Sequence, residues 1–338
     1  MSRTIDQLGG KALEASMRMP LREWNWSEGV ALYGLYVYGE AGERTAIFEF
    51  LRKWYVERMD AGQIQETVNA TAPCFALMKI ADRLDDERAL ALVESRVNFL
   101  LRDAARLANG AFEHTLTETA FGGQLWVDTL FMAGLFLTES GLMLDREEAV
   151  QEGINQFLLH AEALQGNDGL FYHGWDEGKG SVIGCRWARG NAWAAIVGVE
   201  LLGLLPEKHA RDKAQIEDIV TRQLRGLQAK QDLSGLWTTV VTEPGTYVET
   251  SAAAGIAYAV LKGVRLGRLD RRWLPMGERA YRAVCGHVDE EGVLRGVSSG
   301  TAVQRHPGEY QVIARGRQEG YGQGLLLAML SEELTGTR

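Results

Sequence analysis

The pattern of hydrophobic and charged positions divides the chain into two alternating kinds of helical segment. In the first kind, apolar residues recur at three- and four-residue steps with charged residues between them, as in DERALALVESRVNFLLRDAARLA over 86–108. This spacing predicts amphipathic helices that cover a core with one face. Segments of this kind occupy 4–18, 43–61, 86–107, 145–164, 207–230 and 270–288.

The second kind of segment is more apolar and short of charge, and it predicts a set of inner helices. These segments run over 27–39, 71–84, 126–140, 189–205, 249–267 and 319–334, with starts 44, 55, 63, 60 and 70 residues apart. Short glycine-centred, strand-prone segments precede the later ones: NGAFEHTL (109–116), DGLFYHGW (168–175), SGLWTTVV (234–241) and EGVLRGVS (291–298). The order of amphipathic helix, β-like loop and apolar helix is therefore repeated, which indicates a repeat architecture.

Six helical hairpins can stack as an open solenoid or close into a ring. Open solenoids typically have repeats of ~34 to ~47 residues and polar capping repeats at their ends. Here the repeats are longer, and the last inner segment is as apolar as the others. The sequence therefore predicts an all-α, closed (α/α)6 barrel that forms a single domain over 1–338. The loops before the inner helices would meet at one mouth, where we expect the functional site.

Composition narrows the class of protein. The 338 residues include 36 Lys+Arg and 45 Asp+Glu, for a net charge of −9, and 46% are hydrophobic. These proportions are typical of a globular protein, and the acidic balance gives no reason to expect a nucleic-acid partner. No apolar run approaches the ~20 residues of a membrane-spanning helix, and the N-terminal stretch MSRTIDQLGGKALEAS lacks a secretory signal. With three widely separated cysteines, the sequence predicts a cytoplasmic protein without a membrane partner.

Motifs for metals, cofactors and nucleophilic serines are weak or absent. No HxxxH, HEXXH or CxxC spacing and no Walker pattern occurs, so we expect neither a metal nor a cofactor. The pattern GxSxG occurs once, as GVSSG over 296–300. It is followed by TAVQRHPGE rather than by a helix, so it predicts a turn and not a nucleophile elbow at Ser298.

The sharpest candidate for chemistry is Asp128, in GGQLWVDTLFMAGLFL. It stands at the start of an otherwise apolar inner segment, two residues after Trp126. One interpretation is a carboxylate that stabilises the positive end of the helix dipole. The other is a partly buried carboxyl group whose pKa is raised by apolar neighbours, which would let it exchange a proton near neutral pH.

A second group of candidates combines an arginine, a tryptophan and two histidines. Arg189 and Trp193 in CRWARGNAWAA are four residues apart and would share one helix face, where a guanidinium can bind a carboxylate and an indole can stack on a sugar. The alternative is an arginine paired with a surface acid and a tryptophan in the core. His114 and His173 occupy equivalent places in two strand-prone segments, GAFEHT and GLFYHGWD. The sequence leaves two interpretations of these histidines open: each makes a structural hydrogen bond, or each belongs to the functional site.

Five motifs follow one another along nearly the whole chain, from about Trp24 to Gly324. They are VNATAP (68–73), HTLTETAFGGQLWVDTLFMAG (114–134), GLFYHGWD (169–176), WARGNAW (187–193) and YVETSAAAGIAYA (247–259). Together they resemble glycoside hydrolase family 105, the unsaturated rhamnogalacturonyl hydrolases, and the related unsaturated glucuronyl hydrolases. The most specific part of the resemblance is WVDTLFMA followed at this distance by WARGNAW.

The resemblance implies an (α/α)6 barrel without a metal, acting on an oligosaccharide that a polysaccharide lyase has released, as in the degradation of pectin. In such a reaction Asp128 would protonate C4 of the terminal unsaturated uronate and assist water that adds at C5. Where many relatives carry an Asp, this chain has Asn69, which leaves the sugar next to the uronate open. The residues expected to bind substrate are Trp26, Asn69, His114, His173, Trp175, Arg189 and Trp193.

Two other classes of function stay open from the sequence. A sugar epimerase or isomerase could use the same barrel, typically with catalytic histidines on inner helices, and a non-catalytic helical protein could use its tryptophans as partner contacts. We also expect desolvation to dominate the pKa of Asp128 once substrate closes the site, giving an optimum on the acid side of neutrality. The sequence predicts a monomer or a homodimer without distinguishing them.

Overall fold

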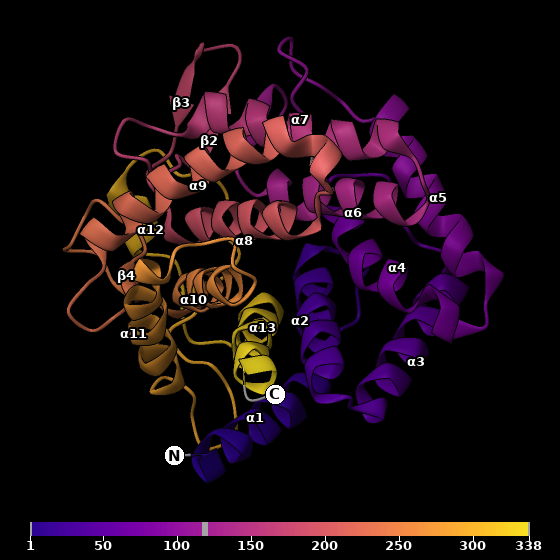
Figure 1. The fold of residues 1–338 in the computed structure, drawn as a ribbon, viewed down its shortest axis with the longest axis horizontal. Coiled ribbons are helices and arrows are strands. Elements are labelled where there is room, and N and C mark those ends of the chain that lie inside the picture. The colour runs from indigo at the N-terminus through magenta and orange to yellow at the C-terminus, as the bar shows by residue number, and fades with distance from the viewer. Residues whose placement is uncertain (1, 117–120, 337–338) are drawn as a thin grey trace.

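The computed structural model describes residues 2–116 and 121–336, in which two concentric sets of helices surround one axis (Figure 1). Residues 117–120 of the motif over 114–134 lie outside the described residues. The inner helices are α2 (Trp26–Gly42), α4 (Ala72–Leu84), α6 (Leu135–Met143), α8 (Ala188–Leu204), α10 (Thr250–Arg265) and α13 (Gly320–Gly336). The outer helices are α1 (Ser2–Met17), α3 (Thr45–Ala61), α5 (Glu87–Arg102), α7 (Glu147–Leu164), α9 (Ala210–Lys230) and α11 (Leu274–Cys285).

The remaining elements are short and lie between these helices. Three-residue helical turns, η1 (Asn69–Thr71), η3 (Glu207–His209) and η4 (Arg271–Trp273), precede α4, α9 and α11. A π-helical turn, η2 (Leu130–Gly134), runs into α6, and the short helix α12 spans Pro307–Gln311. The strands are β1 (Gln124–Trp126), β2 (Gly174–Asp176), β3 (Ser181–Ile183), β4 (Trp237–Thr238) and β5 (Val248–Glu249).

The ring of inner helices closes where the last one packs against the first. Each inner helix contacts the next around the axis, and α13 packs extensively on α2. The two backbones approach so closely that a Cβ atom on Gly34 would lie 2.0 Å from the carbonyl oxygen of Gly324. Only glycine fits at such a contact. The predicted closed (α/α)6 barrel is therefore confirmed, and the open solenoid is wrong.

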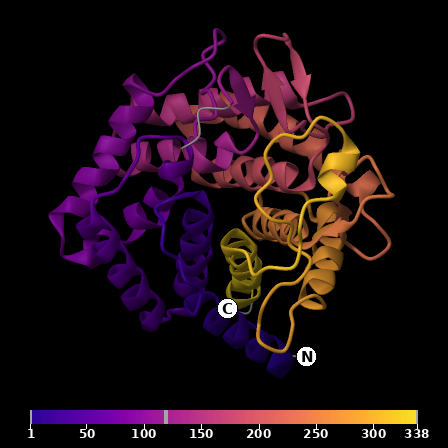
Figure 2. The same ribbon diagram turned by 180° about the vertical axis from the view of Figure 1, so that it is seen from behind.

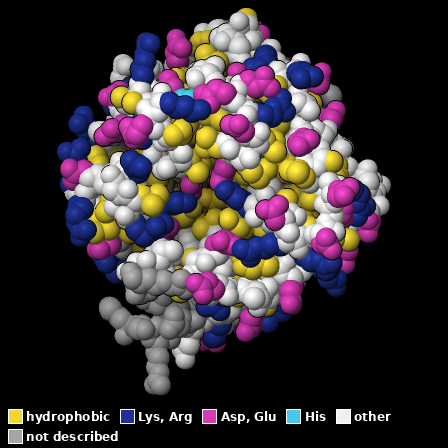
Figure 3. All heavy atoms as spheres, turned by 45° about the vertical axis from the view of Figure 1, so that its right-hand side comes forward, with side chains coloured by type: hydrophobic (Ala, Val, Ile, Leu, Met, Phe, Trp, Pro, Cys, Tyr) yellow, Lys and Arg dark blue, Asp and Glu magenta, His cyan; other side chains and the backbone are white. Residues whose placement is uncertain are grey.

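Burial explains why the two kinds of helix have different sequences. In α8 every residue from Ala188 to Leu202 is buried, because neighbouring inner helices flank it and α9 covers it from outside. An outer helix such as α11 buries only one stripe and keeps its charged side chains outward. Figure 3 shows the result on the surface, where acidic and basic side chains are mixed and hydrophobic ones gather around a central hollow.

The four glycine-centred segments form one repeated turn at the ends of the outer helices. Their glycines, Gly110, Gly169, Gly235 and Gly292, all have φ between 80° and 91°. Each glycine N–H donates to the carbonyl three residues earlier, as from Gly169 to Gly166 at 2.9 Å. Left-handed backbone of this kind favours glycine, which is why the motif recurs. The predicted strands are thus mostly tight turns, and only β2 and β4 within these segments form paired strands.

The loops that precede the inner helices gather on one face, as predicted. Figure 2, the view from the side opposite to Figure 1, looks onto this face. The orange-to-yellow connection from α11 to α13 lies across it. Strands β1, β2 and β3 form a small antiparallel sheet there, in that order, and β4 pairs with β5. Among the described residues, no helix is both long and apolar enough to cross a membrane.

Candidate active site

The pairing of β1 with β2 brings together three of the residues singled out in the sequence. Trp126 of β1 lies opposite Gly174 of β2, and the N–H of Val127 donates to the carbonyl of His173 at 2.9 Å. On the other side of β1, the N–H of His114 donates to the carbonyl of Gln124 at 2.8 Å. The backbone therefore places His114 and His173 on the two sides of the strand that leads directly into Asp128.

Asp128 stands where β1 passes into the inner helix. Its carbonyl accepts the N–H groups of Phe131 and Met132, both at 3.0 Å, and so opens the helix. The first turn is a π turn in which the N–H of Leu135 donates to the carbonyl of Leu130, a widening that is frequent at functional sites. The Asp128 side chain is 13% exposed, and its Oδ2 has no hydrogen-bond partner among the described residues.

Two histidines flank this carboxylate, each oriented by a hydroxyl group. His173 is fully buried, its Nε2 lies 3.4 Å from Asp128 Oδ2, and its Nδ1 lies 2.7 Å from the Tyr310 hydroxyl. His114 Nδ1 lies 2.8 Å from the Thr129 hydroxyl. The His114 ring stacks on Trp126, with ring centroids 4.5 Å apart. Both histidines therefore belong to the site, and their rings are fixed.

A cavity of about 410 Å³ opens beside Asp128 at the mouth of the barrel. Its walls are formed by Trp26, Asn69, His114, Trp126, Asp128 and Trp187, with residues 300–302 on the remaining side. Asp128 is the one carboxylate among its described lining residues, which include no Lys or Arg. Indole walls with a few polar groups suit the apolar face and the hydroxyls of a sugar ring.

Arg189 does not reach this cavity, contrary to the expectation that it binds substrate. The guanidinium is fully buried, and its Nη1 lies 3.2 Å from Glu249 Oε1 and 2.7 Å from Ser298 Oγ. Its Nη2 donates to the carbonyl of Ser299 at 3.1 Å and to the Thr301 hydroxyl at 3.3 Å. Arg189 therefore ties the segment over 298–301, which walls the cavity, to α8 and α10.

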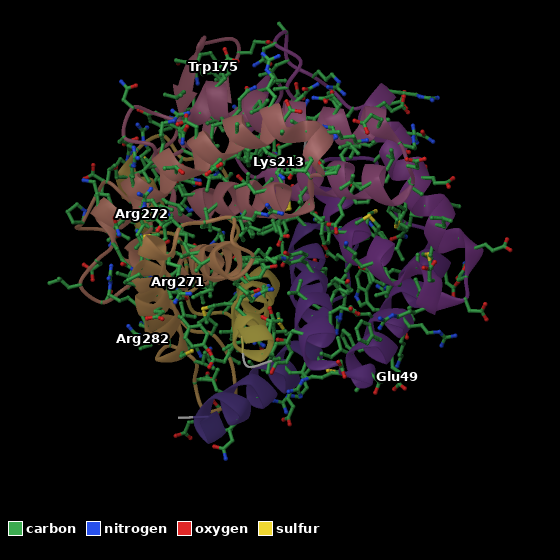
Figure 4. All side chains as sticks on the ribbon, viewed as in Figure 1. Glu49, Trp175, Lys213, Arg271, Arg272 and Arg282 are labelled. Atoms are coloured by element: carbon green, nitrogen blue, oxygen red, sulfur yellow. The ribbon has the colours of Figure 1, made fainter. Side chains whose placement is uncertain are left out.

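Trp193 and Trp175 also lie outside the cavity. Trp193 shares a helix face with Arg189 as predicted, but that face points into the core, where its ring packs on Phe131 at 4.8 Å. Trp175 lies between Gly174 and Asp176 in β2. Its partly buried side chain packs against the core at the rim of the barrel (Figure 4). Trp26 and Asn69, by contrast, line the cavity as expected.

The predicted turn at GVSSG is a buried anchor rather than a nucleophile. Ser298 Oγ accepts from Arg189 and contacts Glu249 Oε1 at 3.1 Å. Glu249 is a second fully buried acid near the mouth, but its oxygens accept from Ser251 and from the N–H of Ala252 at the start of α10. The Glu249 carboxylate is therefore hydrogen-bonded within the protein, and it caps the N-terminus of α10.

The neighbours of Asp128 determine its protonation. Burial raises the pKa of Asp128, but His173, His114 and Arg189 outweigh burial and hold that pKa below its ordinary value. The prediction that desolvation raises the pKa of Asp128 is therefore wrong for the protein without substrate. Burial lowers the pKa of His114 to about 4, and burial also lowers the pKa of His173 against the pull of Asp128. Near neutral pH the site holds a carboxylate between two neutral imidazoles.

Comparisons with known proteins identify the family of this chain. The pattern of Glycosyl Hydrolase Family 88 matches residues 4–336. The chain belongs to this family. It is 33% identical over 315 residues to the unsaturated rhamnogalacturonyl hydrolase YesR of Bacillus subtilis strain 168, covering 92% of this chain and 90% of YesR. The resemblance recognised in the motifs is thus confirmed, and the chain is a glycoside hydrolase.

Solved structures give the same picture for the fold. A possible member of the GH105 family from Salmonella enterica serovar Paratyphi A superimposes with a TM-score of 0.94 at 30% identity, covering 99% of this chain and 94% of that one. The unsaturated glucuronyl hydrolase of Bacillus sp. GL1 superimposes with a TM-score of 0.72 at 18% identity, covering 96% of each chain. The second match shows a shared barrel only.

Several residues around the cavity were not singled out in the sequence, among them Trp187, although it opens the WARGNAW motif. Trp187 stands two residues before Arg189, and its indole Nε1 is buried without a hydrogen-bond partner among the described residues. Residues 300–302 and Tyr310 come from the connection between α11 and α13 and lack a recognisable motif.

No group of three or more His, Cys, Asp and Glu within 2–116 and 121–336 is arranged to hold a metal.

Proposed function

We propose that this family 88 protein removes a 4,5-unsaturated uronate from the non-reducing end of lyase-generated oligosaccharides, in the rhamnogalacturonan class. The observation that carries the proposal is a single carboxylate, Asp128, in an aromatic-walled cavity. Ordinary glycoside hydrolysis uses two carboxylates about 5–9.5 Å apart across the bond that is cleaved. Hydration of a double bond needs only one group that gives and then recovers a proton. The identity to YesR over most of both chains supports the substrate class.

In the proposed reaction Asp128 gives its proton to C4, which leaves an oxocarbenium ion at C5. Water adds to C5 and returns a proton to Asp128, so the carboxyl group is regenerated. The hemiketal at C5 then opens to a ketone, which turns C1 into a hemiacetal that releases the rest of the oligosaccharide. Asp128 thus serves as general acid and general base within one turnover.

The substrate itself would raise the pKa of Asp128 toward the value that this role requires. The uronate carries a carboxylate, and a like charge brought close to Asp128 disfavours its ionised form. Binding also excludes water from the cavity, which acts in the same direction. His173 and His114 oppose the shift, since they hold the pKa of Asp128 down before substrate arrives. Proton uptake on binding is therefore an expected part of the cycle.

Neutral donors would recognise the uronate, because Arg189 is engaged elsewhere. The cavity offers the Asn69 amide, and it is also lined by Trp187, whose buried indole N–H has no hydrogen-bond partner among the described residues. The remaining sugars have a second cavity of about 480 Å³, which shares Phe121 with the first and continues along residues 303–305. Lys179 and Arg305 on its walls suit an anionic sugar farther along the chain.

Loss of the ultraviolet absorbance of the conjugated enoate tests the proposal directly. Unsaturated oligosaccharides ending in rhamnose, glucosamine or galactosamine next to the uronate would be incubated with the protein, and we expect the rhamnose series to react fastest. Absorbance that persists with every member would overturn the proposal. Interconversion of free saturated sugars would favour the epimerase instead, although His114 and His173 lie on loops and not on inner helices. A cytoplasmic location and a monomeric or homodimeric state remain predictions.

A further inference from the structure

Tyr310 is a buried residue of the mouth that the proposed reaction does not use. It lies in the short helix α12, fully buried, and its hydroxyl is 2.7 Å from His173 Nδ1 although the two residues are 137 positions apart. It packs with Trp187, whose ring stacks on His173 at 4.1 Å. His173 is thus held between an indole face and a phenol, with only Nε2 directed toward Asp128.

The direction of the hydrogen bond between Tyr310 and His173 follows from the other partner of the phenol. The backbone N–H of Gln304 donates to the Tyr310 oxygen at 3.3 Å, so this oxygen already accepts one proton. Burial raises the pKa of Tyr310 well above its usual range, so the phenol keeps its own proton. We therefore take the phenol as the donor to His173 Nδ1, since in this arrangement both its proton and its oxygen have partners.

An accepting Nδ1 determines the state of the rest of the ring. Burial lowers the pKa of His173, so the ring is neutral and carries one proton. With Nδ1 accepting, that proton is on Nε2, 3.4 Å from Asp128 Oδ2. The other tautomer would turn a lone pair toward the carboxylate and repel it. The titratable and charged groups facing this pair are His114, Arg189 and Tyr310, with Cys185 next to Tyr310.

We propose that Tyr310 is a positioning residue that fixes the Nε2–H tautomer of His173 and thereby orients Asp128 and tunes its proton transfer. The residues that fix the tautomer come from the same segment that walls the cavity, because Gln304 and Tyr310 both belong to the connection between α11 and α13. A substituent at Gly184 would displace the phenol, since a Cβ atom there would lie 2.7 Å from the Tyr310 hydroxyl oxygen. The tautomer of His173 does not depend on the proposed function, whereas the effect of the tautomer on turnover does.

The first test is the tautomer itself, measured by ¹⁵N NMR of protein labelled at its six histidines, with a His173→Asn variant to assign the signals. We expect wild-type His173 to be protonated at Nε2 and Tyr310→Phe to lose this preference. A wild-type ring protonated at Nδ1 would overturn the proposal, even if Tyr310→Phe failed to fold. This readout does not depend on activity, so failure of the proposed function would show separately, as an unchanged enoate absorbance.

The second test is kinetic. Tyr310→Phe should lower kcat about two- to twelvefold, as expected for the loss of one hydrogen bond, while KM changes little. Once His173 Nε2–H is no longer held toward Asp128, the pKa of Asp128 should rise, so the alkaline limb of the pH profile should move to higher pH. Tyr55→Phe is the matched control, because Tyr55 is equally buried and donates to the Pro73 carbonyl at 2.7 Å, away from His173. Equal kinetics and equal pH limbs in the two variants would contradict the proposal.

Discussion

At the mouth of the barrel Asp128 Oδ2 has no hydrogen-bond partner among the described residues, whereas at the far end Glu200 is held from three sides. Glu200 Oε1 accepts from the Tyr33 hydroxyl at 3.0 Å, from the Tyr258 hydroxyl at 2.8 Å and from Lys262 Nζ at 2.6 Å. A cavity of about 360 Å³ lies there too, near the C-terminal ends of the inner helices. Both ends of one barrel therefore combine a cavity with a buried carboxylate.

The difference lies in how completely the protein satisfies its own polar groups. At the far end Glu332 pairs with Arg265 at 2.7 Å, Glu139 with Lys79 and Glu40 with Arg83, so these acids, like Glu200, all have cationic partners. At the mouth, Asp128 has no such cationic partner among the described residues, and its Oδ2 faces the neutral ring of His173, with Nε2 3.4 Å away. The protein therefore satisfies Asp128 less completely than Glu200, which leaves the Asp128 carboxylate able to act on a ligand in the adjoining cavity.

The direction of a pKa shift does not separate the two ends. Burial raises the pKa of Glu200, but Lys262, Tyr258 and Tyr33 outweigh it and leave the pKa lowered, as at Asp128. Structural ion pairs perturb pKa values as strongly as catalytic groups do. Hydrogen-bond satisfaction is the property that distinguishes the two ends.

The largest effect that would sharpen this contrast is expected for Asp128→Asn. The amide keeps the shape of the side chain but cannot give or take the proton, so kcat should fall by about 10²–10⁴. The melting temperature should fall only modestly, because the contact that the amide weakens is the 3.4 Å approach of Oδ2 to His173 Nε2. Enoate absorbance and thermal unfolding measure the two quantities. A folded variant that retains most of its activity would remove Asp128 from the mechanism.

Glu200→Gln should do the reverse and lower stability without altering the chemistry. The substitution leaves Lys262 without its anion, and breaking a buried ion pair typically costs about 3–5 kcal/mol. Since the pKa of Glu200 is lowered by folding, its contribution is complete above the ordinary range of a glutamate and is lost as the pH falls through the folded value. Urea unfolding at several pH values should show this acid dependence in the wild type and less of it in the variant. A matching loss of kcat would break the contrast between the two ends.

Arg189→Lys tests whether the arginine supports the cavity wall or binds substrate. Lysine keeps the charge but cannot reach Glu249, Ser298 and Ser299 at once, so we expect a loss of about 2–3 kcal/mol in stability. KM should rise as a consequence, because Thr301 shifts with its segment. Raised KM with unchanged unfolding would show instead that Arg189 contacts the uronate directly.

The sequence predicted the fold well because helix periodicity is local. Boundaries of the inner and outer helices fall within a few residues of the observed ones, as for the segment over 249–267 and α10. Asp128, His114 and His173 were singled out because each stands in an unusual local setting, and the structure brings them together. Arg189 and Trp193 share a face as predicted, but local spacing cannot say that this face points into the core. Tyr310 was missed because its partner is 137 residues away.

The smallest effect is expected for Trp187→Phe, and it compares two tryptophans within the site itself. Both Trp187 and Trp126 wall the cavity, but Trp126 Nε1 already donates to Gln124 Oε1 at 2.8 Å whereas Trp187 Nε1 has no partner among the described residues. A phenyl ring can still stack on His173, so the main loss is one hydrogen bond to substrate. Such a bond contributes about 0.5–1.5 kcal/mol, or roughly a two- to twelvefold rise in KM. Trp126→Phe should raise KM less, because its indole N–H is not available to substrate. Equal KM values for the two variants would mean that Trp187 serves as a wall alone.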